Sequence, residues 1–199
     1  MQVRDQIVNS AKGLVKTLGW HDKVLSLACS QANLSSASGR GLFPNGIVEI
    51  AEILMKDWEN QLSLDVKLGD LDNKTLNEQI FLALKKRLSY EVPYMPLWKD
   101  AIYLGALPHN LPITYNRLFS TMNTVWDMIG DNSTGVNWYS KRVLIGQIFI
   151  STEMMMIHDG SIGLTQTWNF LHRQLHDQNF DNIQDLGYLW YKYTKSVFT

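Results

Sequence analysis

The chain contains a single cysteine, Cys29, among 199 residues. One thiol cannot form a disulfide within the chain or build a cysteine-rich metal site, so a reducing compartment is favoured. Proline is also scarce, with five residues, and no Gly/Ser-rich linker or low-complexity run divides the sequence. The length suits one well-cored domain, or a small domain fused to a larger one.

An excess of positive charge is missing as well. Lysine and arginine number 18 against 19 acidic residues, which gives a formal net charge of −1. Affinity for nucleic acid rises with the number of basic contacts, so we expect no nucleic-acid partner.

Long apolar runs are absent too. The longest, VLIGQIFISTEMMMI at 143–157, includes Gln147 and Glu153 and is too short to cross a bilayer. The first 20 residues lack the apolar core of a secretory signal and the Arg-rich bias of a transit peptide. We therefore expect a cytoplasmic bacterial protein or a processed chain.

The sequence also lacks catalytic signatures. It contains no nucleophile elbow, P-loop, GxGxxG or HExxH, and its acidic residues are scattered, so we predict no catalytic residues, no cofactor and no enzyme activity. HRQLH places His172 and His176 at i and i+4, a spacing that permits a metal site if further ligands converge. Without a Glu-x-x-His or a second histidine pair, two solvated histidines are the expected outcome, and no metal is predicted.

What the chain does have is helical periodicity. Apolar residues repeat every 3.6 positions, beginning on one face of a first helix with Ile7, Val8, Ala11, Leu14, Val15 and Leu18. The pattern predicts an all-α fold. Helices are expected at about 7–18, 21–28, 33–38, 45–66, 75–90, 93–107, 112–129, 138–158, 161–177 and from 181 onward. The motif TLNE at 75–78 is a capping box for the fifth of them.

The N-terminal part has the outline of the DNA-reading domain of TetR-type repressors, with a two-helix turn before Leu42, Phe43 and Pro44. Arg40 is the only basic residue in its recognition segment. Gly39 and Gly41 weaken the recognition helix that this segment would form. We interpret residues 1–44 as a vestigial helix-turn-helix domain. Residues 45–178 would form a helical ligand-binding and dimerisation domain, and residues 179–199 an amphipathic C-terminal helix.

Large apolar side chains are concentrated in the later helices. Each of them is most simply explained as ordinary core, yet together the flexible thioethers and large rings suit a dry cavity for a long apolar ligand. The predicted lipid-binding residues are Trp98, Ile102, Met122, Trp126, Phe149, Met154, Met155, Met156, Trp168 and Leu171.

The C-terminal segment carries one narrow apolar stripe: Ile183, Leu186, Trp190, Tyr193 and Val197. Such a stripe packs on its own domain, docks on a partner or lies in a membrane interface. We predict membrane contact from its position at the chain end.

Residues 130–142, GDNSTGVNWYSKR, set Trp138 and Tyr139 side by side in a polar, turn-rich stretch. Together with ALPHNLP, the GW at 19–20, the LFPNG at 42–46 and TWNFLHRQLHD at 167–177, this block resembles the lipid-binding accessory family of ubiquinone biosynthesis. The resemblance extends from about residue 4 to residue 178.

The resemblance implies a TetR-like homodimer that has lost DNA binding and holds an isoprenoid quinone precursor. Such a protein does no chemistry, and it presents the lipid to the di-iron demethoxyubiquinone hydroxylase at the inner membrane, on the matrix side in a mitochondrion. By the same resemblance, the partner-binding residues are Asp131, Asn137, Trp138, Tyr139 and Arg142.

Gly135 and Val136 stand where most members of that family have an aspartate and a phenylalanine. The alternative functions are a TetR-type regulator that responds to an apolar ligand, and a scaffold with a filled core.

Overall fold

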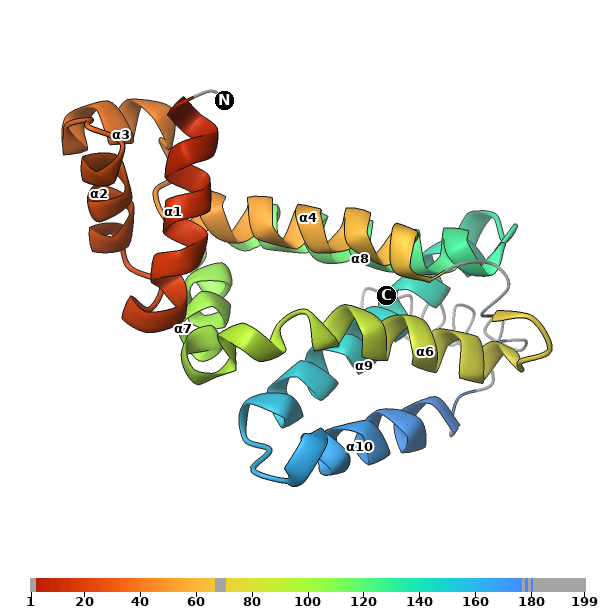
Figure 1. Cartoon of the computed structure of the whole chain (residues 1–199). Coiled ribbons are helices and arrows are strands. Elements are labelled where there is room, and N and C mark those ends of the chain that lie inside the picture. Colours follow the sequence, from red (N-terminus) through yellow and green to blue (C-terminus); the bar gives the residue numbers. More distant parts are fainter. Residues whose placement is uncertain (1–2, 67–70, 177, 179, 181–199) are drawn as a thin grey trace, which may run out of the picture. The chain divides into compact units, whose positions relative to one another are not determined.

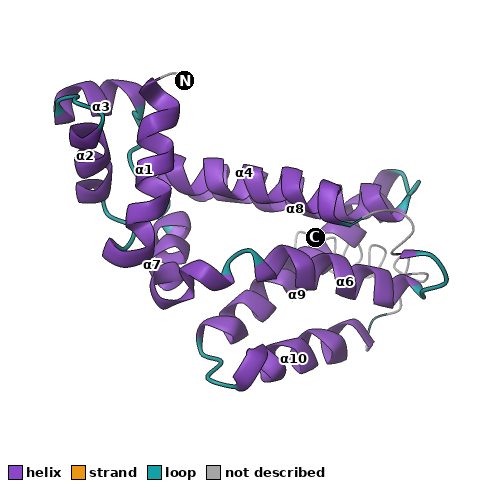
Figure 2. Cartoon of the chain, in the orientation of Figure 1, coloured by secondary structure: helices purple, strands orange, loops and turns teal. Residues whose placement is uncertain are grey.

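The computed structural model describes residues 3–66, 71–176, 178 and 180. In these ranges it contains helices and no β-strand, which confirms the all-α fold (Figures 1 and 2). The elements are α1 (Val3–Leu18), α2 (Asp22–Gln31), α3 (Ser36–Leu42), α4 (Val48–Asp65), α6 (Leu76–Ser89), the 3-10 helix η1 (Val92–Tyr94), α7 (Met95–Ala106), α8 (Leu111–Ile129), α9 (Gly135–Ile157), the 3-10 helix η2 (Ile162–Leu164) and α10 (Thr165–His176).

Two local sequence signals position their helices as predicted. In α1 most of the apolar stripe faces inward, with Ile7, Ala11 and Val15 buried, whereas Leu18 at the end of the helix is exposed. At the start of α6 the backbone N–H of Thr75 donates to Glu78 Oε2 at 2.7 Å, and the N–H of Glu78 donates to Thr75 Oγ1 at 3.4 Å. This is the capping box predicted from TLNE.

The third helix lies a few residues later than the predicted 33–38. Asn33 has a φ of +58° and cannot continue a helix, while Ser35 is extended and its Oγ accepts the N–H of Ser38 at 3.2 Å. The serine cap therefore starts α3 at Ser36, and the helix runs on through Gly39 and Gly41 to Leu42.

The chain divides into two compact units. The first comprises the described residues up to Gln61 together with Arg87–Arg117, and the second comprises Leu62–Lys86 and the described residues from Leu118 onward. The sequence-based boundaries at residues 44 and 178 remain a prediction.

Each unit has its own core. In the first, α1, α2 and α7 surround an aromatic cluster of Trp20, Trp58, Tyr94 and Trp98. In the second, α9 packs on α10, and Asn77 at the start of α6 donates to the carbonyl of Leu175 at 2.9 Å. None of the helices in the described ranges has the length and apolar character needed to cross a membrane.

Candidate functional site

The turn between α8 and α9 is built from a helix stop signal. Gly130 has a φ of +82°, and its N–H donates to the Asp127 carbonyl at 3.1 Å. The N–H of Asp131 reaches the Trp126 carbonyl at 3.0 Å, which completes a Schellman motif with glycine at its left-handed position. The chain reverses here, and α9 starts at Gly135.

Asp131 organises this turn. Its carboxylate accepts hydrogen bonds from Lys141 Nζ at 2.7 Å, Arg142 Nη1 at 3.2 Å and Ser133 Oγ at 2.5 Å, and its side chain is only 3% exposed. Burial opposes ionisation of this carboxyl, but the hydrogen bonds from Lys141, Ser133 and Arg142 outweigh it and lower the pKa of Asp131. The carboxylate is therefore a fixed negative charge beneath the surface.

Arg142 lies directly under Trp138. The arginine side chain is 1% exposed, and its Nε donates to Asn123 Oδ1 at 2.9 Å. Its guanidinium carbon stands 4.1 Å from the centre of the Trp138 ring. Asp131 and Arg142, both predicted to contact a partner, thus position the aromatic residues from below.

The rings themselves form a cluster at the surface. Tyr139 is 61% exposed and meets Trp138 edge to face, with 4.7 Å between ring centroids. Phe119 of α8 lies 5.3 Å from Trp138 and 6.3 Å from Tyr139. The exposed Val136 and Val143 lie three residues before and four after Tyr139, on the same face of α9. We call Phe119, Val136, Trp138, Tyr139 and Val143 the aromatic surface.

Sequence reasoning identified Trp138 and Tyr139 and missed Phe119. The phenylalanine belongs to another helix, and nothing in the spacing of residues 119 and 138 indicates contact. The half-buried Asn137 shares the first turns of α9 with the two rings.

The ten predicted lipid-binding residues fall in two units. Trp98 and Ile102 belong to the first, where Trp98 is fully buried at 5.4 Å from both Trp20 and Trp58. Ile102 packs against the same core. In this structure these two side chains contribute to the aromatic cluster of the first unit.

The other eight lie in the second unit with different exposures. Five are buried: Met122, Trp126, Phe149, Met156 and Leu171. Met155 and Trp168 are half-buried, and Met154 is exposed.

Trp126, like Trp20 in the first unit, has a buried indole N–H without a partner among the described residues. The Trp126 side chain is 1% exposed. Lys141 Nζ lies 5.0 Å from the centre of its ring, and Phe180 meets the ring edge to face at 5.8 Å. A buried N–H without an acceptor costs free energy, so buried tryptophans usually donate this hydrogen to an acceptor.

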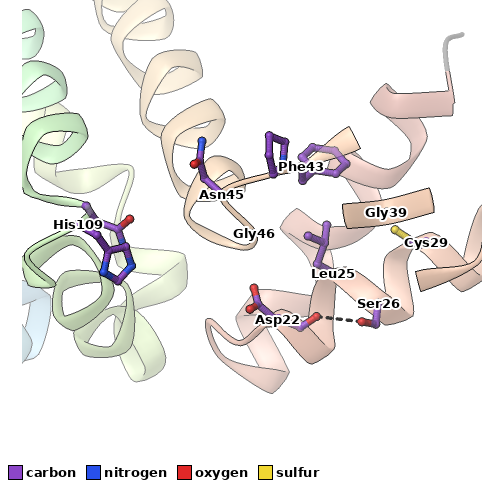
Figure 3. Close-up of a pocket in the computed structure, with 11 residues that line it drawn as sticks. Asp22, Leu25, Ser26, Cys29, Gly39, Phe43, Asn45, Gly46 and His109 are labelled. Atoms are coloured by element: carbon purple, nitrogen blue, oxygen red, sulfur yellow. Dashed lines mark hydrogen bonds between the residues drawn. The ribbon is translucent and has the colours of Figure 1, made fainter. Parts of the chain in front are cut away.

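The first unit holds a pocket of about 480 Å³ that sequence reasoning did not find (Figure 3). Three segments far apart in the chain form it. The lining residues are Asp22, Leu25, Ser26, Cys29, Gly39, Phe43, Pro44, Asn45, Gly46, His109 and Asn110. Asp22 Oδ1 accepts the N–H of Ile47 at 3.0 Å, and burial raises the pKa of the Cys29 thiol, which faces Gly39.

His172 and His176 follow each other along an exposed face of α10. Their rings stack with centroids 6.4 Å apart, and His172 meets Phe81 of α6 edge to face. They line a cavity of about 240 Å³ together with Thr75, Asn77, Glu78, Phe81 and Leu175. Across the described residues, His, Cys, Asp and Glu side chains do not gather in groups of three that could hold a metal ion.

Neither of these two pockets is lined by any of the ten residues predicted to bind lipid. The predicted membrane-contact residues Ile183, Leu186, Trp190, Tyr193 and Val197 lie outside the described residues.

Comparison with known proteins shows what the chain is similar to. A family model described as COQ9 matches residues 111–180, which include the aromatic surface and Trp126. The chain is similar to the ubiquinone biosynthesis protein COQ9, mitochondrial, of Bos taurus, with 30% identity over 183 residues. The Homo sapiens protein of the same name is 28% identical over 183 residues, and a probable ubiquinone biosynthesis protein coq9, mitochondrial, of Dictyostelium discoideum is 26% identical over 184.

Each of these matches covers 88% of this chain. The chain spans 57% of the length of the Bos taurus and Homo sapiens relatives and 59% of the Dictyostelium discoideum relative. The resemblance predicted from the sequence motifs is thus confirmed: residues 111–180 match the COQ9 family model, and most of the chain is similar to ubiquinone biosynthesis proteins of that name.

Proposed function

We propose that this chain is a noncatalytic accessory protein of ubiquinone biosynthesis. It binds an isoprenoid quinone precursor and presents it to the di-iron demethoxyubiquinone hydroxylase at the membrane. It acts as a homodimer and associates peripherally with the inner membrane. In a mitochondrion this is the matrix side; the names of the curated relatives give a mitochondrial location.

The observation that carries the proposal is the aromatic surface. Tyr139 is 61% exposed, yet it rests on Trp138, which the buried Arg142 holds in place. A rigid, amphipathic ring that is already positioned loses little conformational entropy when a partner covers it. Each such ring can contribute about 2 kcal/mol or more of binding energy once dehydrated.

The interior of the second unit supports the lipid-binding half of the proposal. Met122 and Met156, whose thioethers are flexible, are buried in the second unit, as are Phe149 and Trp126. The Nε1 of Trp126 has no hydrogen-bond partner among the described residues, and such a donor suits a ligand that is apolar along its length and carries an oxygen at one end. A quinone precursor with an isoprenoid tail has this chemistry.

The test of docking replaces the exposed ring. Tyr139→Ala, alone and with Trp138→Ala, is expected to reduce copurification of the hydroxylase by about tenfold or more. Tyr103→Ala removes an exposed tyrosine of α7 in the first unit and is the matched control. Unchanged association in the double variant would show that the aromatic surface is not the docking site.

The test of lipid binding uses mass spectrometry of the native protein. Prenyl lipid is expected in extracts of the purified chain, and Trp126→Phe is expected to reduce its amount because the donor is lost while the ring remains. A scaffold with a filled core gives no lipid in either preparation.

A TetR-type regulator is the second candidate, since α1, α2 and α3 follow one another and pack as a helix-turn-helix head would. However, α3 has only seven residues and contains Gly39 and Gly41, which makes a poor recognition helix. Gel shifts with the DNA around the gene discriminate, because specific binding that weakens on ligand addition fits only the regulator.

A further inference from the structure

The turn between α9 and α10 exposes an isoleucine almost completely. Ile162 is 97% exposed and begins η2. This 3-10 helix belongs to the connection between α9 and α10, two helices that Figure 1 labels. Most surface isoleucines keep part of the side chain against a neighbour, so exposure of the whole side chain is unusual. We call residues 159–168 the hairpin tip.

A dense set of hydrogen bonds fixes the conformation of the hairpin tip. The Asp159 carboxylate accepts the N–H and the hydroxyl of Ser161 at 2.8 and 2.6 Å. It also accepts the N–H and the hydroxyl of Thr167 at 2.8 and 2.6 Å. The carboxylate therefore ties the start of the turn to the first turn of α10.

The backbone of the tip is strained as well as fixed. Gly163 has a φ of +67° and Leu164 a φ of +57°, a region that leucine rarely adopts. A residue is held there only when its surroundings determine the conformation. The exposure of Ile162 is thus imposed by the turn.

The carbonyl groups around Ile162 are already paired. The carbonyl of Ser161 accepts the N–H of Leu164 at 3.1 Å, and that of Ile162 accepts Thr165 Oγ1 at 2.7 Å. The carbonyl of Gly163 accepts the indole N–H of Trp168 at 3.0 Å. Backbone groups that enter an apolar medium must find their partners within the protein, and these three have done so.

The surroundings of the tip also suit an anionic surface. Residues 160–176 contain no acidic residue and include Arg173, and Lys85 Nζ lies 5.2 Å from the centre of the Trp168 ring. Of the nearby carboxylates, Asp159 is held by its hydrogen bonds and Glu78 by the α6 capping box. Tryptophan beside a lysine is a combination typical of the membrane interface.

We propose that the hairpin tip inserts Ile162 into the boundary between headgroups and acyl chains of an anionic lipid bilayer. This contact adds to the membrane association of the proposed function but rests on residues that the predicted C-terminal stripe does not include. Trp168 lies at headgroup level, and Lys85 and Arg173 face the lipid phosphates.

Vesicle sedimentation of the full chain tests the proposal. With vesicles of phosphatidylcholine that contain about a quarter phosphatidylglycerol, Ile162→Ser is expected to bind about tenfold more weakly than the original chain. Leu64→Ser removes an exposed leucine of α4 and is expected to bind as the original does. Equal binding by the Ile162 variant would overturn the proposal, and a thermal melt confirms that both variants are folded.

A fluorescent label at the tip gives an independent measurement. Since Cys29 is buried, a maleimide dye attached to Ile162→Cys reports position 162 alone. We expect the emission of the dye to shift to shorter wavelength with the anionic vesicles, and to shift less with vesicles of phosphatidylcholine alone. No shift with either vesicle, or a shift only when the hydroxylase is added, means that the tip does not insert into lipid.

The experiments distinguish failure of the hairpin-tip proposal from failure of the proposed function. Ile162→Ser is expected to retain copurified prenyl lipid and hydroxylase association, because Ile162 belongs neither to the aromatic surface nor to the buried set around Trp126. Loss of the proposed function would appear as a missing lipid or missing hydroxylase in the unsubstituted chain, whatever the vesicles show.

Discussion

The guanidinium carbon of Arg142 lies 4.1 Å from the centre of the Trp138 ring, and Arg142 Nη1 donates to the carbonyl of Trp138 at 3.0 Å. One buried side chain thus fixes both the ring and the backbone of its neighbour one helical turn away. The geometry of the aromatic surface at the start of α9 is therefore determined from inside the protein.

Arg142→Lys is expected to disturb this geometry while keeping the charge. A lysine cannot stack a planar group on the indole, nor reach Asn123 and Asp131 in the same fork. We expect a loss of about 2 kcal/mol in the free energy of unfolding, with hydroxylase association about tenfold weaker. Urea unfolding and copurification measure the two effects, and Arg173→Lys on α10 is the control that leaves both unchanged.

Asp131→Asn should be among the most destabilising conservative changes in the chain. It removes the carboxylate that pairs with Lys141 and Arg142, and the arginine remains buried with its charge only partly compensated. The expected cost in the free energy of unfolding is about 3 kcal/mol. Asp127→Asn removes an exposed carboxylate 3.8 Å from the same guanidinium and should cost less than about 1 kcal/mol. If the two variants lost the same free energy of unfolding, burial would not determine how much each aspartate stabilises Arg142.

Stability is expected to fall at acid pH because of two aspartates. Hydrogen bonds from Ser161 and Thr167 lower the pKa of Asp159, and the bonds described above lower that of Asp131. An unfolded aspartate has a pKa of about 3.9, so their contribution is complete above that pH and is lost as the pH falls toward the lower folded values. Thermal unfolding between about pH 6 and pH 2 measures this loss, and Asp159→Asn should make the dependence shallower below about pH 4.

Gly39→Ala tests the contact between α2 and α3. A methyl group at this position would overlap the sulfur of Cys29, so the thiol or the helices would have to shift. In an unobstructed helix the change would be stabilising, whereas here we expect a loss of about 1–3 kcal/mol in the free energy of unfolding. Combination with Cys29→Ala should recover much of the loss, and a double-mutant cycle by urea unfolding shows whether it does.

Local signals in the sequence were sufficient to predict where most of the described helices lie. The stripe through Ile7, Ala11 and Val15 and the capping box at Thr75 act within one or two turns, so their outcome is readable from spacing alone. The start of α3 was misplaced because Asn33, Ser35 and Ser36 all suit a cap or turn, and only the backbone geometry shows which one caps.

The sequence alone did not predict which side chains from distant segments contact one another. Trp98 and Trp126 belong to the same compositional class, yet one lies in the aromatic cluster of the first unit and the other beneath Lys141 in the second. Phe119 and Trp138, like Cys29 and Gly39, meet because helices pack, and no periodicity encodes that meeting.

Lys141 and Arg142 are consecutive residues of α9 that bond the same carboxylate on different oxygens. Lys141 also lies over the interior indole of Trp126, whereas Arg142 lies under the surface indole of Trp138. The outer and inner tryptophans are therefore connected through a single anion. A partner that docks on the aromatic surface without contacting Trp126 is therefore expected to change the fluorescence emission of Trp126. The measurement uses a variant whose other tryptophans are replaced by phenylalanine.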